Sequence, residues 1–135
     1  MVCLYCDGST RVINSRPQKR LNRIWRRRQC AKCQATFTTI EGAALSESLV
    51  TRTPAKTTLT PFLRDKLYLS VYNSLQHRDN AIQDATGLTD TIMSQLSAAT
   101  AGGIVHTDRL VIITHDVLKH FDTAAAVHYA AFHKI

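Results

Sequence analysis

The residues best placed to do chemistry are four cysteines near the amino terminus. They form two matched C-x-x-C pairs, Cys3 with Cys6 and Cys30 with Cys33, and the chain has no others. Two residues between thiols let both sulfurs bind one ion from a tight turn, and two such turns supply a tetrahedral set. The spacing therefore predicts one structural Zn²⁺ per chain, because four sulfur ligands leave no open position for water.

Two other interpretations of the cysteines are two disulfides or four unrelated buried thiols. Disulfides form in oxidising compartments, but residues 1–10 lack the charged start and the apolar core of a signal peptide. No apolar run approaches the roughly 20 residues that span a bilayer, so we expect a cytoplasmic protein. Unrelated thiols would not fall into two equal pairs, and zinc is the favoured interpretation.

The residues that follow each pair indicate how the two turns close. Asp7-Gly8 follows the first pair and is a ready turn, in which Gly8 is free to take a positive φ. Gln34-Ala35 follows the second pair, at a place where such turns often have a glycine. The second turn lacks that glycine.

Positive charge is concentrated in the same part of the chain as the cysteines. The protein carries 17 Lys and Arg against 10 Asp and Glu, a net charge of +7. Residues 1–45 hold nine of these cations and two carboxylates, whereas the remaining ninety residues hold eight of each sign. Four thiolates and one Zn²⁺ sum to −2, so the metal site offsets only part of the excess. We expect a nucleic acid to neutralise the rest; the alternative is a basic face that is only solvated.

Six basic residues are the candidate nucleic-acid contacts. Alternation along a strand would put the first and third arginines of the run before Cys30 on one face and the second on the other. Trp25 either packs in the ribbon or stacks on an unpaired base, and in so small a core we favour packing. The candidate contacts are Arg11, Arg16, Lys19, Arg26, Arg27 and Arg28.

The elements that position the cysteines are expected to be short strands. The sequence predicts strands at 11–15 and 24–29, an exposed connection at 17–22, and a third strand at 36–40 that is rich in β-branched residues. This is the pattern of a zinc ribbon, here residues 1–45. A segment of this size cannot bury enough surface to fold alone, so the metal supplies what its core lacks.

Residues 46–135 predict a second, mainly helical domain. A linker-like stretch at 41–48 precedes a short hairpin, with strands at 49–53 and 57–60 around a turn at 54–56. Thr60 is the expected N-cap of the first helix and Pro61 its first residue. Later helices are expected at about 80–100, ended by Gly102-Gly103, from Thr107 or Asp108 to 121, and from Asp122 to the carboxyl end.

The apolar stripes of these helices are most simply a buried core, and with the ribbon they predict the α+β class. The six histidines scatter without an HExxH motif, and no Walker-type loop or GxGxxG occurs, so we expect no enzymatic activity. The expected core positions are Leu63, Leu67, Val71 and Leu75, then Ile82, Ala85, Leu88, Ile92 and Leu96, then Leu110, Ile113, Val117 and Phe121, and last Ala125, Tyr129 and Phe132.

Four segments, in this order and spacing, resemble a known family. They are CLYC, RVINSRP, WRRRQCAKC and TFTTIE. They are similar to the amino-terminal zinc ribbon of the bacterial ribonucleotide-reductase repressor family (NrdR), whose pattern is CPFC, DSRP, RRRREC and RFTTYE. Residues 61–67 and 117–125 resemble parts of that family's second domain, an ATP-cone, so the resemblance covers nearly the whole chain.

The resemblance implies a transcriptional repressor that binds operator DNA upstream of ribonucleotide-reductase genes. Its ATP-cone, here residues 46–135, would sense ATP and dATP, and nucleotide-dependent homo-oligomerisation would control DNA binding. Lys66 matches a family position and is the first candidate phosphate contact, with Arg52, Lys56 and Arg64 as helpers. The family's V-x-K-R-D-G hairpin differs here, because residues 50–56 read VTRTPAK and lack the Asp-Gly turn.

Two other functions fit parts of the sequence. An RNA-binding zinc ribbon would hold structured RNA on the same basic strands, beside a helical domain that senses nothing. A nucleotide-binding adaptor whose ribbon contacts protein would have negligible affinity for DNA at physiological salt. Competition between duplex DNA and structured RNA separates the first alternative from a repressor, whereas a salt titration does not, since both interactions are electrostatic.

Overall fold

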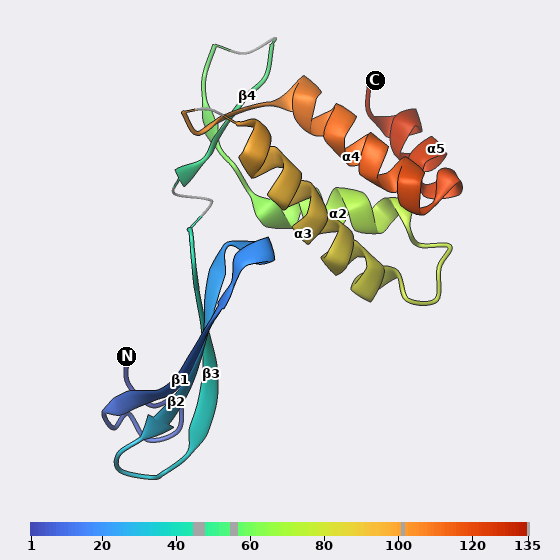
Figure 1. The fold of residues 1–135 in the computed structure, drawn as a ribbon. Coiled ribbons are helices and arrows are strands. Elements are labelled where there is room, and N and C mark those ends of the chain that lie inside the picture. The colour runs from blue at the N-terminus through green and yellow to red at the C-terminus, as the bar shows by residue number, and fades with distance from the viewer. Residues whose placement is uncertain (45–47, 55–56, 101, 135) are drawn as a thin grey trace. The chain divides into compact units, whose positions relative to one another are not determined.

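The computed structural model describes residues 1–44, 48–54, 57–100 and 102–134 (Figure 1). The chain divides into two compact units, Met1–Ala43 and Ala44–Ile135. The sequence-based boundary after residue 45 lies two residues further along. Among the described residues, no helix is both long and apolar enough to cross a membrane.

The first unit is a three-stranded antiparallel sheet in the order β1-β2-β3. Its strands are β1 (Thr10–Gln18), β2 (Arg23–Cys30) and β3 (Thr36–Gly42). The three predicted strands are confirmed, and each is longer than predicted. The connection between the first two is correspondingly shorter, because a single 3₁₀ turn, η1 (Lys19–Leu21), followed by Asn22 at φ 47°, is enough to reverse the chain.

A β-bulge in β1 decides which of its residues share a face. Val12 pairs with Arg28 and the next pair is Asn14 with Arg27, so Ile13 is an extra residue on β1. In a regular strand, residues five apart point to opposite faces. The extra residue reverses this, so that side chains five apart across the bulge lie on the same face.

Among its described residues, the second unit combines four helices with a small mixed sheet, so the predicted α+β class is confirmed (Figure 1). β4 (Val50–Arg52) pairs antiparallel with β5 (Thr60–Pro61), which is the predicted hairpin with shorter strands. On its other edge β4 pairs in parallel with β6 (Ile104–His106), a strand the sequence did not predict. The helices are α2 (Arg64–Ser74), α3 (Ala81–Ala99), α4 (Thr107–Phe121) and α5 (Thr123–Phe132).

One apolar core lies among these helices, and most of its members were predicted. Leu110 and Ile113 pack at its border. Four predicted members are wrong, because their side chains are exposed: Leu63, Ile82, Phe121 and Phe132. The confirmed buried members are Leu67, Val71, Leu75, Ala85, Leu88, Ile92, Leu96, Val117, Ala125 and Tyr129.

Three of the four wrong core predictions have a local reason. Leu63 precedes α2 as its N-cap residue and so lies outside the helical stripe. The buried face of α3 begins at Ala81 and repeats at Ala85, which turns Ile82 outward. Phe121 lies under the guanidinium of Arg78, 4.7 Å from its ring centre, at the surface of the unit.

The helix ends were predicted less well than the helices. Thr60 and Pro61 do not begin the first helix, because both belong to β5, an edge strand in which a proline's missing N–H costs no ladder bond. The last helix was predicted to run from Asp122. It begins at Thr123, and Asp122 is its N-cap residue, which accepts a hydrogen bond from the N–H of Ala125 at 3.1 Å.

Candidate metal centre, nucleic-acid interface and ligand cavity

Two similar turns hold the four cysteines of the first unit. In the first turn, the N–H of Cys3 donates to the carbonyl of Gly8 at 2.9 Å. In the second, the N–H of Cys30 donates to the carbonyl of Ala35 at 3.0 Å, again five residues ahead. The chain thus builds the same closed turn twice, once before β1 and once between β2 and β3.

The chain reverses at the same position in both turns, and neither of the two residues at that position is a glycine. Asp7 and Gln34, each directly after a second cysteine, have φ values of 55° and 62°. Gly8 does not take the positive φ that is open to it. Gly8 is needed for space instead, since a Cβ there would lie 3.0 Å from Lys32 Cβ and 3.1 Å from Cys30 Sγ.

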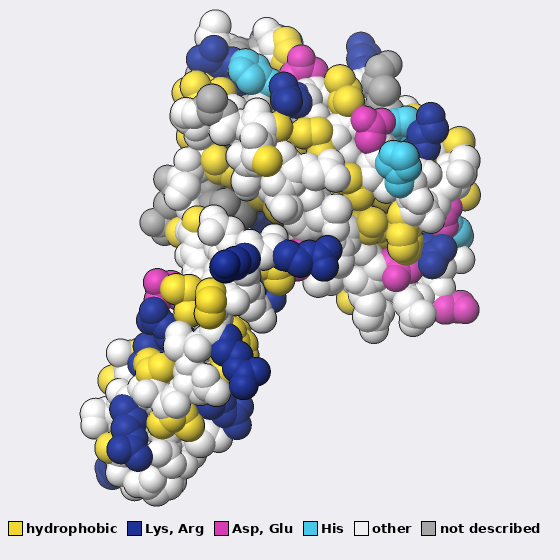
Figure 2. Space-filling view, in the orientation of Figure 1, with side chains coloured by type: hydrophobic (Ala, Val, Ile, Leu, Met, Phe, Trp, Pro, Cys, Tyr) yellow, Lys and Arg dark blue, Asp and Glu magenta, His cyan; other side chains and the backbone are white. Residues whose placement is uncertain are grey.

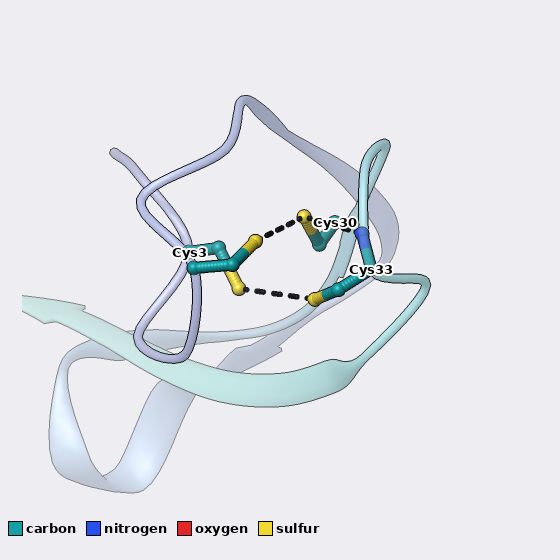
Figure 3. A group of neighbouring side chains, drawn as sticks. Cys3, Cys30 and Cys33 are labelled. Carbon is teal, nitrogen blue, oxygen red and sulfur yellow. Dashed lines mark hydrogen bonds between the residues drawn. The ribbon is translucent and has the colours of Figure 1, made fainter.

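The four sulfur atoms converge between the two turns (Figure 3). All lie within 4.8 Å of one another, with Cys3 Sγ 3.7 Å from Cys33 Sγ and Cys6 Sγ 3.5 Å from Cys30 Sγ. A tetrahedral Zn²⁺ with Zn–S bonds of about 2.3 Å requires sulfurs about 3.8 Å apart. The set fits a structural zinc ion, and both the disulfide and the unrelated-thiol interpretations are wrong, because all four thiols are free and adjacent.

Backbone N–H groups favour the thiolate form that binds the metal. The N–H of Cys33 donates to Cys30 Sγ at 3.4 Å and, with the N–H of Lys32 at 3.3 Å, lowers the pKa of Cys30 to about 6. The N–H of Gly8 also lowers the pKa of Cys6, but the neighbouring thiols outweigh it and raise that pKa to about 12. A divalent cation that binds this set displaces the remaining protons, so its affinity rises with pH.

Basic side chains lie in several patches on the visible face of the first unit, drawn as dark-blue atoms in Figure 2. Arg11 and Arg16 are exposed on β1, and Lys19 is exposed in η1. Arg11 donates to Gln29 Oε1 at 3.0 Å. These three predicted contacts are therefore accessible to a partner.

The arginine run on β2 divides between the two faces of the sheet. Arg27 donates to the hydroxyls of Thr36 at 2.8 Å and Thr38 at 3.3 Å. On the opposite face, Arg26 forms an ion pair with Glu41 at 2.7 Å. Arg28 shares that face and donates to the hydroxyl of Thr39 at 3.3 Å and to that of Thr10 at 3.5 Å.

Trp25 is half-buried on the same face as Arg27. It pairs across the sheet with Arg16 on one side and Ile40 on the other. The buried core of this unit consists of Cys3, Cys30 and Phe37 and does not include the indole. Packing against strand neighbours and contact with a ligand therefore both stay open to Trp25.

The second unit contains a cavity of about 650 Å³, and one of the predicted nucleotide contacts, Lys66, lines it. Its wall comes from the β4–β5 hairpin, from α2, and from the start of α4 and the end of α5. Lys66 lines it together with the hydroxyl groups of Thr51, Thr53, Thr58, Thr60 and Thr107. A volume of this size is typical of small-molecule sites.

Two aromatic residues that the sequence analysis did not assign to a site form one wall of this cavity. The rings of Tyr129 and His133 stack at 4.1 Å, and His133 Nε2 shares a hydrogen bond of 2.9 Å with Ser70 Oγ. Burial raises the pKa of Tyr129 and lowers the pKa of His133, so it favours the uncharged form of both side chains. The i, i+4 spacing of the two rings on the last helix was the available sequence signal.

Of the other three predicted phosphate contacts, the two that the structure describes do not line the cavity. Arg64 donates to Asp90 at 2.6 Å in an ion pair between α2 and α3. Arg52 follows Thr51 along β4 and so points to the opposite face from the cavity. Lys56 falls outside the described residues. Within the described part of the chain, Lys66 is the one lysine or arginine that lines the cavity.

Comparisons with known proteins match the first unit to a family model and nearly the whole chain to curated relatives. A family model described as "Transcriptional repressor NrdR-like, N-terminal domain" matches residues 1–41. The chain is 34% identical over 140 residues to a transcriptional repressor NrdR of Maricaulis maris, which covers 100% of this chain and 85% of that protein. It is 31% identical over 135 residues to proteins of the same name from Brucella ovis and Brucella canis, covering 99% of this chain and 84% of each relative.

Proposed function

This chain belongs to the NrdR family of transcriptional repressors, and we propose that it represses genes by binding duplex operator DNA through its zinc-ribbon unit. The family consists of regulators and not of enzymes. Its name points to ribonucleotide-reductase genes as the targets. The observation that carries the proposal is that the whole excess of positive charge coincides with the unit that holds the four-cysteine site.

The zinc ion would act on DNA binding through the fold of the ribbon. The buried core of this unit has three residues, and two of them, Cys3 and Cys30, are metal ligands. So small a core cannot hold the three strands together by apolar burial alone. Zinc bound by Cys3, Cys6, Cys30 and Cys33 would therefore fix the sheet that presents the arginines to DNA.

An adenine nucleotide is the proposed regulator, and the cavity of the second unit is its proposed site. Lys66 would bind a phosphate group, and the threonine hydroxyls would donate to phosphate or ribose oxygens. The stacked rings of Tyr129 and His133 offer an aromatic wall for the base. Binding of ATP or dATP would then change the homo-oligomeric state and, with it, the affinity for DNA.

Binding of the zinc-loaded chain to DNA tests the proposal. The probe is a duplex from upstream of the ribonucleotide-reductase genes of the same genome, measured with ATP, with dATP and with neither. With ~4–6 phosphates neutralised per ribbon, log K should fall against log salt with a slope of roughly −4 to −5. Lys66→Ala should remove the nucleotide effect and leave basal DNA binding intact, whereas Lys119→Ala, an exposed lysine on α4, should keep both.

The outcomes separate the two halves of the proposal. Tighter binding to structured RNA than to the duplex would contradict the repressor function and favour the RNA-binding alternative. The protein could also bind the duplex specifically while neither ATP nor dATP changes its oligomeric state or its affinity for DNA. That result would support the repressor function and exclude nucleotide control.

A further inference from the structure

We propose that one face of the ribbon sheet carries the DNA contacts, and that its centre is a set of four arginines on β1 and β2. This inference rests on the proposed DNA-binding function and adds which face and which residues perform it. The four residues, called the arginine zigzag below, are Arg11, Arg16, Arg23 and Arg27.

The register of β1 and β2 defines the zigzag. On this face, four successive cross-strand pairs each contain one arginine, and the arginine alternates between the strands from one pair to the next. The bulge at Ile13 makes this possible, because it returns Arg11 to the face of Arg16. The pairs, in order along the sheet, are Arg11 with Gln29, Asn14 with Arg27, Arg16 with Trp25, and Gln18 with Arg23.

The spacing of these four positive charges favours the binding of a polyanion. Like charges never face each other directly, and diagonal neighbours on adjacent strands are about 7–8 Å apart. Successive pairs advance about 7 Å along the sheet, so the four charges form a track of about 20 Å. The third strand adds Thr36, Thr38, Ile40 and Gly42 to this face, so within the described sheet no carboxylate neutralises the track.

Side-chain contacts support this assignment independently of the register. Arg23 Nε donates to Gln18 Oε1 at 2.6 Å, and Arg11 donates to Gln29 Oε1 at 3.0 Å. These neutral amides orient the guanidinium groups without cancelling their charge. Arg, Asn and Gln are also the side chains that read base edges in the major groove, which admits a two-stranded β-ribbon.

The opposite face fits DNA less well. Its arginines are Arg26 and Arg28, and it carries Glu41, the one carboxylate of the described sheet, which forms an ion pair with Arg26. Arg28 donates to threonine hydroxyls, as Arg27 does on the zigzag face. The same face carries the buried side chains of Phe37 and Cys30, which form the unit's small core. The candidate set from the sequence therefore changes: Arg26 and Arg28 leave it, and Arg23 and Trp25 enter it.

Trp25 provides a reporter for the proposed face. It lies opposite Arg16, between the pairs that hold Arg23 and Arg27, and it is the single tryptophan of the chain. DNA bound on the zigzag face would change the environment of the half-buried indole directly. DNA bound on the opposite face would leave its emission unchanged.

Four matched variants of the full-length, zinc-loaded protein test the inference. Arg23→Ala and Arg27→Ala change the zigzag, whereas Arg26→Ala and Arg28→Ala change the opposite face of the same strand. The probe is a mixed-sequence duplex of about 40 bp at about 50 mM salt, since phosphate contacts do not depend on sequence. Each zigzag variant should lose about tenfold in affinity and flatten the salt slope by about one unit, and each control should lose less than about twofold.

Tryptophan emission and zinc content complete the experiment. Duplex DNA should shift or quench the emission of wild type and of the two control variants, all with one zinc per chain. If an alanine variant loses zinc, the glutamine variant at the same position replaces it. Equal losses on both faces, or unchanged emission in DNA-bound wild type, would overturn the face assignment while leaving DNA binding standing. A wild type that binds hairpin RNA but not the duplex would overturn both the inference and the proposed function.

Discussion

Gly8 is the more crowded of the two glycines in the zinc-ribbon unit. A methyl group there would lie 3.1 Å from Cys30 Sγ and 3.3 Å from Cys6 Sγ, and 3.0 Å from Lys32 Cβ. Zinc bound at this site would fix the two sulfurs, so the turn itself would have to move. We predict that Gly8→Ala lowers zinc affinity at least tenfold, about 1.4 kcal/mol or more, measured by competition with a chromophoric chelator.

Gly42→Ala is the matched control for that prediction. Gly42 lies at the end of β3, and a Cβ there would be 3.5 Å from Arg23 Cβ, an ordinary contact. Zinc affinity in this variant should match that of wild type. Equal zinc affinity in the Gly8 and Gly42 variants would show that the turn adapts and that Gly8 has no special role.

Individual residues of the metal site were largely predictable, and individual residues of the interface were not. The four cysteines follow from spacing alone, because two C-x-x-C turns have few other uses. The role of Gly8 depends on Lys32 and Cys30, which the fold brings to it from far along the chain. The shared face of Arg11 and Arg16 depends on the bulge at Ile13, for which the sequence gives no signal.

At the scale of elements, one carboxylate fixes the start of α5 and ties it to the turn between α2 and α3. Asp122 accepts from the N–H of Ala125 at 3.1 Å, from Arg78 at 2.9 Å and from His77 at 3.1 Å. The backbone N–H of Ala125 contributes most to holding the pKa of Asp122 well below its usual range, followed by His77 and Arg78. The charged form of Asp122 therefore stabilises the fold.

This pKa shift predicts a loss of stability in acid. A folded-state pKa below the unfolded value of about 3.9 contributes stability that is present above that pH and is lost as pH falls toward the folded-state pKa. Urea unfolding followed by circular dichroism should show this loss below about pH 4. Asp122→Asn, which keeps a good capping group, should reduce that pH dependence, and Asp122→Ala should also cost about 1–2 kcal/mol at neutral pH.

Asp108→Asn is the control for the charge effect. Asp108 is exposed in the first turn of α4, so its replacement should leave the acid profile close to that of wild type. An Asp122→Asn profile that also matches wild type would mean that the ion pairs to Arg78 and His77 contribute nothing measurable.

Long elements with a clear hydrophobic period were predicted most accurately. The long helix α3 was placed within one residue at each end, because five apolar positions repeat along it. β6 was missed because a three-residue strand has no period to detect and its partner, β4, lies some fifty residues earlier. Thr60-Pro61 was predicted as a helix start, but a Thr-Pro pair is also compatible with an edge strand, and here it forms β5.

At the scale of the whole molecule, the two units draw their stability from different sources. In the described part of the helical unit, sixteen buried apolar residues form one core, including Val71, Ile92 and Leu118, whose side chains are fully enclosed. The ribbon has three, and two of those are cysteines of the metal site. Burial can account for the stability of the first but not of the second. Removal of zinc should therefore unfold one unit and spare the other.

The intact protein contains a separate probe for each unit, so this prediction can be tested without dividing the chain. Trp25, the single tryptophan, lies in the ribbon, and every long helix lies in the other unit. A strong chelator should shift Trp25 emission to that of an exposed indole and abolish DNA binding. The helical circular dichroism and its melting temperature should stay within about 2 °C, less than the shift that ~1 kcal/mol would cause in a unit of this size. Restored zinc should reverse the emission change. A fall in both signals together would mean that the two units unfold as one and that the helical core depends on the ribbon.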